Sequence, residues 1–67
     1  MKTIARWESR GKKHWYALYQ DDFGYNYEGN GCSGFMGGVT EEEAFAKMED
    51  MIYWAKKIDG HNMKRVI

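Results

Sequence analysis

The sequence predicts an α+β fold, in which three antiparallel β-strands are followed by one C-terminal helix packed on one face of the sheet. Three observations lead to this prediction. β-forming residues dominate segments 3–9 and 14–20, turn residues follow each of them, and a single long amphipathic pattern begins after Thr40. One helix against a small sheet makes a two-layer arrangement. A chain of 67 residues has room for one core, so we expect residues 1–67 to form a single small domain.

The three strands are bounded by recognisable turn signals. "TIARWES" (3–9) and "HWYALYQ" (14–20) are separated by "SRGK", whose glycine favours a turn, so they are expected to form a β-hairpin. "DDFG" is the next turn signal. "YNYEG" (25–29) then resumes the alternation as a third strand, which fades into glycines.

The helix has clear start and stop signals. Thr40 stands three residues before Glu43 in a capping box, and the acidic run 41–43 suits the positive end of the helix dipole. Gly60 is a typical helix stop, so the helix is expected from about Glu41 to Asp59. The tail 61–67 is either frayed or a short added strand. The side chains expected to face the sheet are Ala44, Phe45, Met48, Met51, Ile52, Ala55 and Ile58.

Strand 14–20 is apolar on both faces, although one helix can cover only one face of the sheet. We expect Trp7, Trp15, Ala17 and Tyr19 to share one face, and Ile4, Tyr16 and Leu18 to share the other. The second face either carries a few surface tyrosines or forms an interface, most simply within a homodimer. The sequence leaves open which face the helix covers, so the candidate residues for this interaction surface come from both faces: Trp7, Trp15, Tyr16, Tyr19, Tyr25 and Tyr27.

Composition excludes several classes of protein. A single cysteine, Cys32, allows no internal disulfide, and with only His14 and His61 beside it no zinc site is expected. We therefore expect no metal and no cofactor. The sequence contains no apolar run of about 18 residues, so no membrane span is predicted. The N-terminus lacks the apolar centre of a signal peptide. The lone free cysteine favours a reducing compartment, so a cytoplasmic location is expected.

Charge is unevenly distributed, although the formal net charge is zero. Counting Lys and Arg against Asp and Glu, residues 1–14 carry +4, residues 15–50 carry −7 and residues 51–67 carry +3. This pattern fits either head-to-tail complementarity between subunits or an ordinary solvated surface.

The segment Gly29–Gly34 matches G-x-G-x-x-G letter for letter, but its context argues against a phosphate-binding loop. The dinucleotide fingerprint requires a helix that begins at the glycines, within a βαβ unit. Here the helix cap, Thr40, comes six residues after the last glycine of the motif. We expect these glycines to serve backbone geometry. Cys32 also lacks a recognisable base partner, so enzymatic activity is not expected.

The alternative to a protein-interaction module is a nucleic-acid-binding protein. An aromatic sheet face can stack bases while basic side chains hold phosphates. The residues suited to this role are Trp15, Tyr16, Tyr19, Tyr25 and Tyr27, with Lys12, Lys13, Lys64 and Arg65. The zero net charge and the acidic middle of the chain argue against it, because nucleic-acid-binding domains are usually basic.

Residues 21–52 resemble HicB-like antitoxin domains. The positions that carry the resemblance are Gly24-Tyr25, Gly31-Cys32, and Gly38, Thr40, Glu42, Glu43 and Ala44 at the helix start. The chain departs from the family in lacking the prolines before Gly31-Cys32, in its spacing around these pairs, and in having no room for a DNA-binding domain. The resemblance implies a strand-strand-strand-helix fold, oligomerisation and protein partners. The function expected is a small non-enzymatic interaction module, such as an accessory or inhibitor protein of a phage or mobile element.

Overall fold

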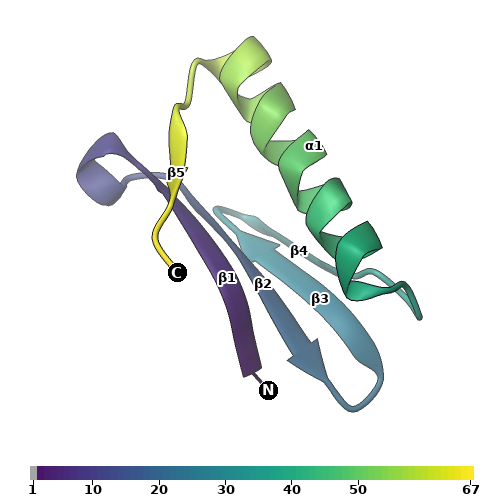
Figure 1. Cartoon of the computed structure of the whole chain (residues 1–67). Helices are drawn as coiled ribbons and strands as arrows, with labels where there is room; N and C mark the ends of the chain where they lie inside the picture. Colours follow the sequence, from purple (N-terminus) through teal and green to yellow (C-terminus); the bar gives the residue numbers. More distant parts are fainter. Residues whose placement is uncertain (1) are drawn as a thin grey trace.

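The computed structural model describes residues 2–67 and shows one helix packed on an antiparallel sheet (Figure 1). The elements in chain order are β1 (Lys2–Ser9), β2 (Trp15–Asp21), β3 (Gly24–Gly29), β4 (Cys32–Phe35), α1 (Glu41–Asp59) and β5 (Met63–Arg65). The strand order is β4-β3-β2-β1-β5. The α+β class and the single C-terminal helix are confirmed. The prediction of three strands is wrong, because the sheet has five.

Strands β1 and β2 form the predicted hairpin, but with a register that the sequence did not reveal. A short 3-10 turn (Arg10–Lys12) joins them, with Gly11 at φ 82°, and the Ser9 N–H donates to the His14 carbonyl at 2.8 Å. This connection sets Trp7 opposite Tyr16. Directly paired residues share a face, so Trp7 lies with Tyr16 and Leu18 rather than with Trp15. The predicted grouping of Trp7 with Trp15 is therefore wrong.

Strand β4 was missed because its sequence is rich in glycine and lies where the third strand was expected to end. Asn30 and Gly31 form the turn between β3 and β4, and Gly31 has φ +73°. The Asn30 side chain fastens this turn to the start of β2, since it accepts from the Trp15 N–H at 2.6 Å and donates to the Lys13 carbonyl at 2.8 Å. An Asn-Gly pair is a strong hairpin signal, so the sequence did contain the information.

The C-terminal tail contains an added strand, which was one of its two predicted states. β5 pairs antiparallel with β1, on the opposite edge of the sheet from β4. The Val66 N–H extends this pairing by donating to the Arg6 carbonyl at 2.8 Å. Figure 1 shows how α1 carries the chain across one face of the sheet, from the end of β4 to β5 beside β1.

The helix begins and ends where its signals predicted. The Thr40 hydroxyl accepts from the Glu43 N–H at 3.2 Å, and the Glu43 carboxylate accepts from the Thr40 N–H at 3.3 Å. Gly60 closes the helix at φ 71°, with its N–H directed to the carbonyls of Ala55 and Lys56. Within residues 2–67, no helix is long and apolar enough to cross a membrane.

The core lies between α1 and the face of the sheet formed mainly by β1, β2 and β3. Its buried members are Ala5, Trp7, Leu18, Tyr25, Ala44 and Met48. Phe45, Met51 and Ile52 of the predicted stripe are half-buried against this cluster. Ile58 was expected in the stripe but is 74% exposed. It lies about 80° around the helix from Met48, in the last full turn, and so points beside the core rather than into it.

Candidate interaction surface

Within residues 2–67, no layer packs on the face of the sheet opposite α1, which is called the uncovered face. Its side chains follow from the strand register, because paired residues share a face and successive residues alternate. It includes Trp15, Ala17 and Tyr19 on β2, Thr3, Arg6 and Glu8 on β1, Asn26 and Glu28 on β3, Ser33 and Phe35 on β4, and Lys64 on β5. Figure 1 shows α1 confined to the other side of the sheet.

A fixed arrangement of three side chains occupies the β1–β2 part of the uncovered face. The Arg6 guanidinium carbon lies 4.4 Å from the centroid of the Trp15 ring. Arg6 Nε also donates to Glu8 Oε2 at 2.8 Å, with the two side chains 33% and 19% exposed. A part-exposed ion pair adds little to stability, but together with the ring it restricts the guanidinium before any partner arrives. Less side-chain freedom is then lost on binding.

The centre of the uncovered face is filled around Ala17, whereas an open hollow of about 370 Å³ lies towards β4, lined on this face by Tyr19, Asn26, Glu28 and Ser33. Ala17 is fully buried although no helix covers it, and its cross-strand neighbours are Arg6 and Glu28. The longer side chains around Ala17 therefore close over it. Tyr19 is half-buried beside it, and Phe35 at the β4 edge is 56% exposed. Because this hollow is open rather than enclosed, the face suits a macromolecular partner better than a small ligand.

The structure divides the six aromatic residues predicted for the interaction surface between the two faces. Trp15 and Tyr19 lie on the uncovered face, whereas Trp7, Tyr16, Tyr25 and Tyr27 lie on the helix side. Trp7 and Tyr25 are only 7% and 8% exposed. Burial raises the pKa of Tyr16, and the charges of Cys32 and Asp59 add to the rise, which is consistent with a ring on the helix side.

Sequence reasoning missed Arg6 and Phe35 as members of the uncovered face. Arg6 and Trp7 are adjacent in the first strand and so lie on opposite faces. Once Trp7 is known to be buried on the helix side, Arg6 follows as a residue of the uncovered face. Phe35 was hidden because β4 itself was not predicted.

A second candidate feature is a basic region at the end of the sheet where β1 joins β2. The rings of His14 and His61 stack there, with centroids 3.6 Å apart and planes at 18°. They line a hollow of about 190 Å³ together with Ser9, Arg10, Lys13, Gly60 and Asn62. No carboxylate belongs to this lining among residues 2–67. Of the other predicted phosphate-binding residues, Lys64 lies on the uncovered face, whereas the Arg65 guanidinium lies 5.0 Å from the Phe45 ring on the helix side.

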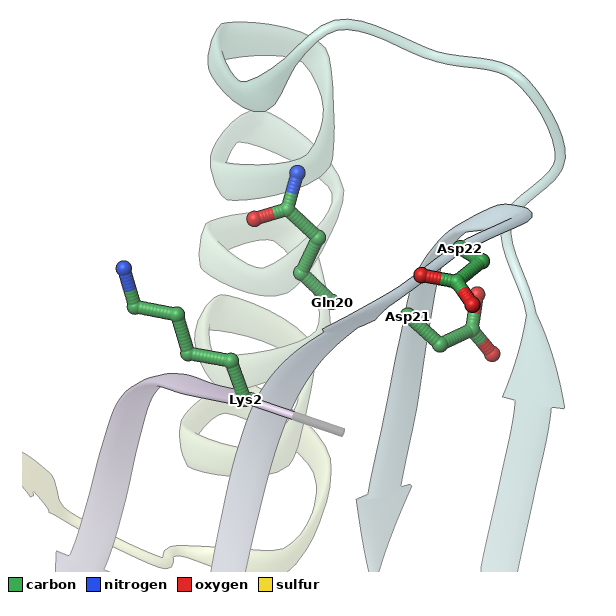
Figure 2. Close-up of a pocket in the computed structure, with 4 residues that line it drawn as sticks. All are labelled: Lys2, Gln20, Asp21 and Asp22. Carbon is green, nitrogen blue, oxygen red and sulfur yellow. The ribbon is translucent and has the colours of Figure 1, made fainter.

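The hollow of about 490 Å³ beside the β2–β3 turn does not assemble a ligand site (Figure 2). Lys2 and Gln20 project together from neighbouring strands, away from the carboxylates of Asp21 and Asp22. Asp21 is engaged within the turn, where it accepts from the N–H groups of Phe23 at 2.8 Å and Gly24 at 3.0 Å and from the Asn26 amide at 2.8 Å. The Phe23 and Asn26 hydrogen bonds hold the pKa of Asp21 below its usual value.

The segment Gly29–Gly34 is the β3–β4 hairpin, and α1 starts only at Glu41. Gly29 is required by close packing, because a Cβ there would stand 2.5 Å from the Tyr16 ring.

Cys32 is an exposed free thiol on β4. Across residues 2–67, no group of three or more His, Cys, Asp or Glu side chains is placed to hold a metal ion.

Comparison with models of known protein families, with curated proteins and with solved structures found no significant match. The resemblance to HicB-like antitoxin domains therefore stays a prediction from sequence.

Proposed function

We propose that this chain is a non-enzymatic interaction module that binds a protein partner through the uncovered face. The observation that carries the proposal is that Trp15, Arg6 and Tyr19 share a face of the sheet that no other element within residues 2–67 covers. Tryptophan, tyrosine and arginine are the residue types most enriched among the side chains that dominate binding energy at protein interfaces. Here they stand together, with the arginine already restricted by its neighbours.

The charges of the uncovered face favour a different protein over a second copy stacked face to face. Glu8 and Glu28 flank the aromatic centre on β1 and β3, and Lys64 lies beyond Glu8 on β5. Two sheets packed face to face bury both inner faces in a layer about 10 Å thick. Charged groups held in such a layer carry a desolvation penalty unless they are well paired. A partner with its own complementary polar rim avoids this penalty.

The sequence resemblance suggests what kind of protein this module is. Under that resemblance it acts as an antitoxin-like inhibitor or accessory protein, and the uncovered face occupies the surface of the protein it restrains. A reducing compartment such as the cytoplasm is proposed as well, because the only cysteine is an exposed free thiol.

The test compares capture of host proteins by the wild type and two variants, read by mass spectrometry. Trp15→Glu places a charge at the centre of the uncovered face, and Tyr53→Glu makes the same kind of change on the solvent side of α1, where Tyr53 is 51% exposed. We expect one stoichiometric partner with the wild type and with Tyr53→Glu, and its loss with Trp15→Glu. Circular dichroism must show that both variants are folded. A partner retained equally by both variants, or no partner at all, contradicts the proposal.

A second candidate function is single-stranded nucleic-acid binding, which the basic region around His14 and His61 favours. Arg10 and Lys13 line its hollow without a carboxylate beside them. Phosphate binding of this kind weakens steeply with salt. Saturable binding of a mixed oligonucleotide that is lost between 50 and 200 mM salt, and lost in Lys13→Glu, would replace the protein-binding proposal.

A further inference from the structure

The edge of the sheet at β4 is open to another strand. β4 has a neighbour on one side only, β3, and its sequence Cys-Ser-Gly-Phe contains no charged residue. Natural sheets usually protect an edge with lysine, proline, a bulge or a covering element. The opposite edge follows this rule, since β5 carries Lys64 and Arg65. β4 is short, with four residues, but it has none of these other protections, which suggests that this edge is paired.

The free hydrogen-bonding groups of β4 can be identified from its pairing with β3. The Met36 N–H donates to the Tyr25 carbonyl at 2.8 Å, so Tyr25 and Met36 are a hydrogen-bonded pair. Such pairs alternate along an antiparallel ladder. Gly34 and Cys32 therefore direct their backbone groups to β3, whereas Ser33 and Phe35 direct theirs outward. The open edge presents two N–H groups and two carbonyls, spaced as an antiparallel strand requires.

The side of α1 above β4 exposes two large apolar side chains, Trp54 and Ile58, with the charged Lys47 and Glu43 beside Trp54. On the opposite side of the helix, Phe45 faces β1 and β5, with its ring 6.1 Å from that of Trp7 and 5.0 Å from the Arg65 guanidinium. Trp54 comes nine residues after Phe45, which at about 100° per residue places it half a turn away, towards β3 and β4. Ile58 lies about 40° from Trp54. The two side chains are 56% and 74% exposed.

We propose that β4 pairs antiparallel with β4 of a second copy of this chain, across a twofold axis at Gly34. The two five-stranded sheets then form one continuous sheet with both helices on the same face. Trp54 and Ile58 from both copies lie in the trough between the helices. This dimer uses the β4 edge and the flank of α1, and it leaves the uncovered face free for the partner proposed above.

The proposed register satisfies every outward group of β4 between Ser33 and Phe35. An axis at Gly34 sets Ser33 opposite Phe35 of the second copy, and Phe35 opposite Ser33 of the second copy. Each is a hydrogen-bonded pair, so all four outward donors and acceptors on each edge find partners. Gly34 faces Gly34 of the second copy at the close approach typical of a pair without hydrogen bonds, where the lack of a side chain helps.

The dimensions of the trough match the side chains available to fill it. α1 packs on β2 and β3, and neighbouring strands lie about 4.8 Å apart, so the two helix axes stand about 19 Å apart on a flat sheet. Helices with side chains are about 10–12 Å wide, which leaves a gap of about 7–9 Å. The helix-side residues of β4 are the small Cys32 and Gly34, and the ring of Tyr27 lies over Gly34, where a Cβ would stand 2.7 Å from its Cε1. The rest of the gap needs large side chains, which Trp54 and Ile58 provide.

The distribution of charge fits the same twofold arrangement. The twofold axis makes the two helices antiparallel. The acidic first turn of one α1, Glu41–Glu43, then lies on the same side as the basic last turn of the other, Lys56 and Lys57. The two helices are about 19 Å apart, which exceeds the screening length of about 8 Å in physiological salt. The attraction is therefore weak: it favours this orientation of the copies but adds little to their affinity. Parallel helices would place like charges on the same side.

The contact area predicts a weak dimer. Trp54 exposes about 140 Å² if a whole tryptophan offers about 250 Å². Four residues of edge and two large side chains per copy stay below the roughly 800 Å² per partner of a standard interface. We therefore expect association that depends visibly on protein concentration in the micromolar range.

Sedimentation equilibrium over a wide concentration range tests the proposal with the full chain. Ser33→Pro removes an outward N–H while leaving the β3 ladder intact, and Trp54→Lys places a charge in the trough. Each is expected to raise the dimer dissociation constant at least tenfold. Ala46→Lys is the control, because Ala46 is exposed and lies more than two turns from Trp54 and about 80° around the helix, and it should leave the constant unchanged.

Three outcomes would overturn the proposal. These are a wild type that stays monomeric at high concentration, a dimer that survives Trp54→Lys, or a dimer that Trp15→Glu dissociates instead. Trp54→Lys decides the matter if Ser33→Pro fails to fold, since Trp54 is exposed and its change spares the core. Failure of the dimer proposal can be told apart from failure of the proposed function, because Trp15→Glu tests partner capture and Trp54→Lys tests dimerisation.

Discussion

Gly29 is a position at which one added methyl group should destabilise the fold chiefly through one contact, with the ring of Tyr16. A Cβ on Gly29 would stand 2.5 Å from Cδ1 and 2.7 Å from Cε1 of the Tyr16 ring, and 3.1 Å from the Trp15 carbonyl oxygen. Carbon atoms in favourable contact are about 3.5–4.0 Å apart, so the ring must move by about 1 Å. Tyr16 is half-buried and packs against the core cluster on the helix side, so the core limits the movement of the ring only on one side.

The cost of Gly29→Ala follows from the ways in which Tyr16 can respond. Forcing the side chain off its rotamer costs about 0.5–1.5 kcal/mol, and shifting the surrounding backbone brings overpacking costs to about 1–3 kcal/mol. At about 0.05–0.15 kcal/mol per residue, a 67-residue domain has about 3–10 kcal/mol of unfolding free energy. We therefore expect Gly29→Ala to lower the urea midpoint substantially without abolishing folding.

Urea unfolding followed by circular dichroism measures this effect against a matched control. Gly38→Ala adds the same methyl where no atom lies within 4 Å and φ is ordinary, so it should be neutral or stabilise by up to about 1 kcal/mol. In a Tyr16→Ala background the Gly29→Ala penalty should largely vanish, giving a coupling of about 1–2 kcal/mol. If Gly29→Ala matches Gly38→Ala, or if its penalty survives without the Tyr16 ring, the reasoning is refuted.

Two further predictions concern the core and the β2–β3 turn. Met48 is fully buried, so Met48→Ala should cost about 2–5 kcal/mol in urea melts, and an effect below 1 kcal/mol would place Met48 outside the core. The pKa of Asp21 is lowered by the hydrogen bonds from Phe23 and Asn26, so its ionised form stabilises the fold above pH 3.8. Asp21→Asn should therefore be less stable than the wild type at pH 7, with the difference disappearing as the pH falls below about 4. A stability difference that does not change between pH 7 and pH 3 would contradict this origin.

Features that depend on neighbouring residues were determined by the sequence itself. The bounds of α1 followed from Thr40, Glu43 and Gly60, because capping and stop signals act within one helical turn. The β1–β2 hairpin and the single helix were predictable for the same reason. The β3–β4 hairpin was also local, and Asn30-Gly31 was sufficient to predict it.

Features that depend on register and on distant neighbours were decided only by the tertiary structure. The face of Trp7 depended on the geometry of the turn before Trp15, since a shift of one residue moves every side chain of a strand to the other face. Gly29 gained its role only because the ring of Tyr16 occupies the adjacent space.

The candidate surfaces show the same division. The sequence indicated that an aromatic strand would have one face without a helix, because one helix cannot cover both faces of a sheet. It could not indicate that Arg6 would lie over Trp15, or that the exposed Trp54 would stand on the side of the open β4 edge. The first placement depends on the register of β1 against β2. The second depends on where α1 crosses the sheet, and the packing of Phe45 against Trp7 and Arg65, which lie far apart along the chain, contributes to that position.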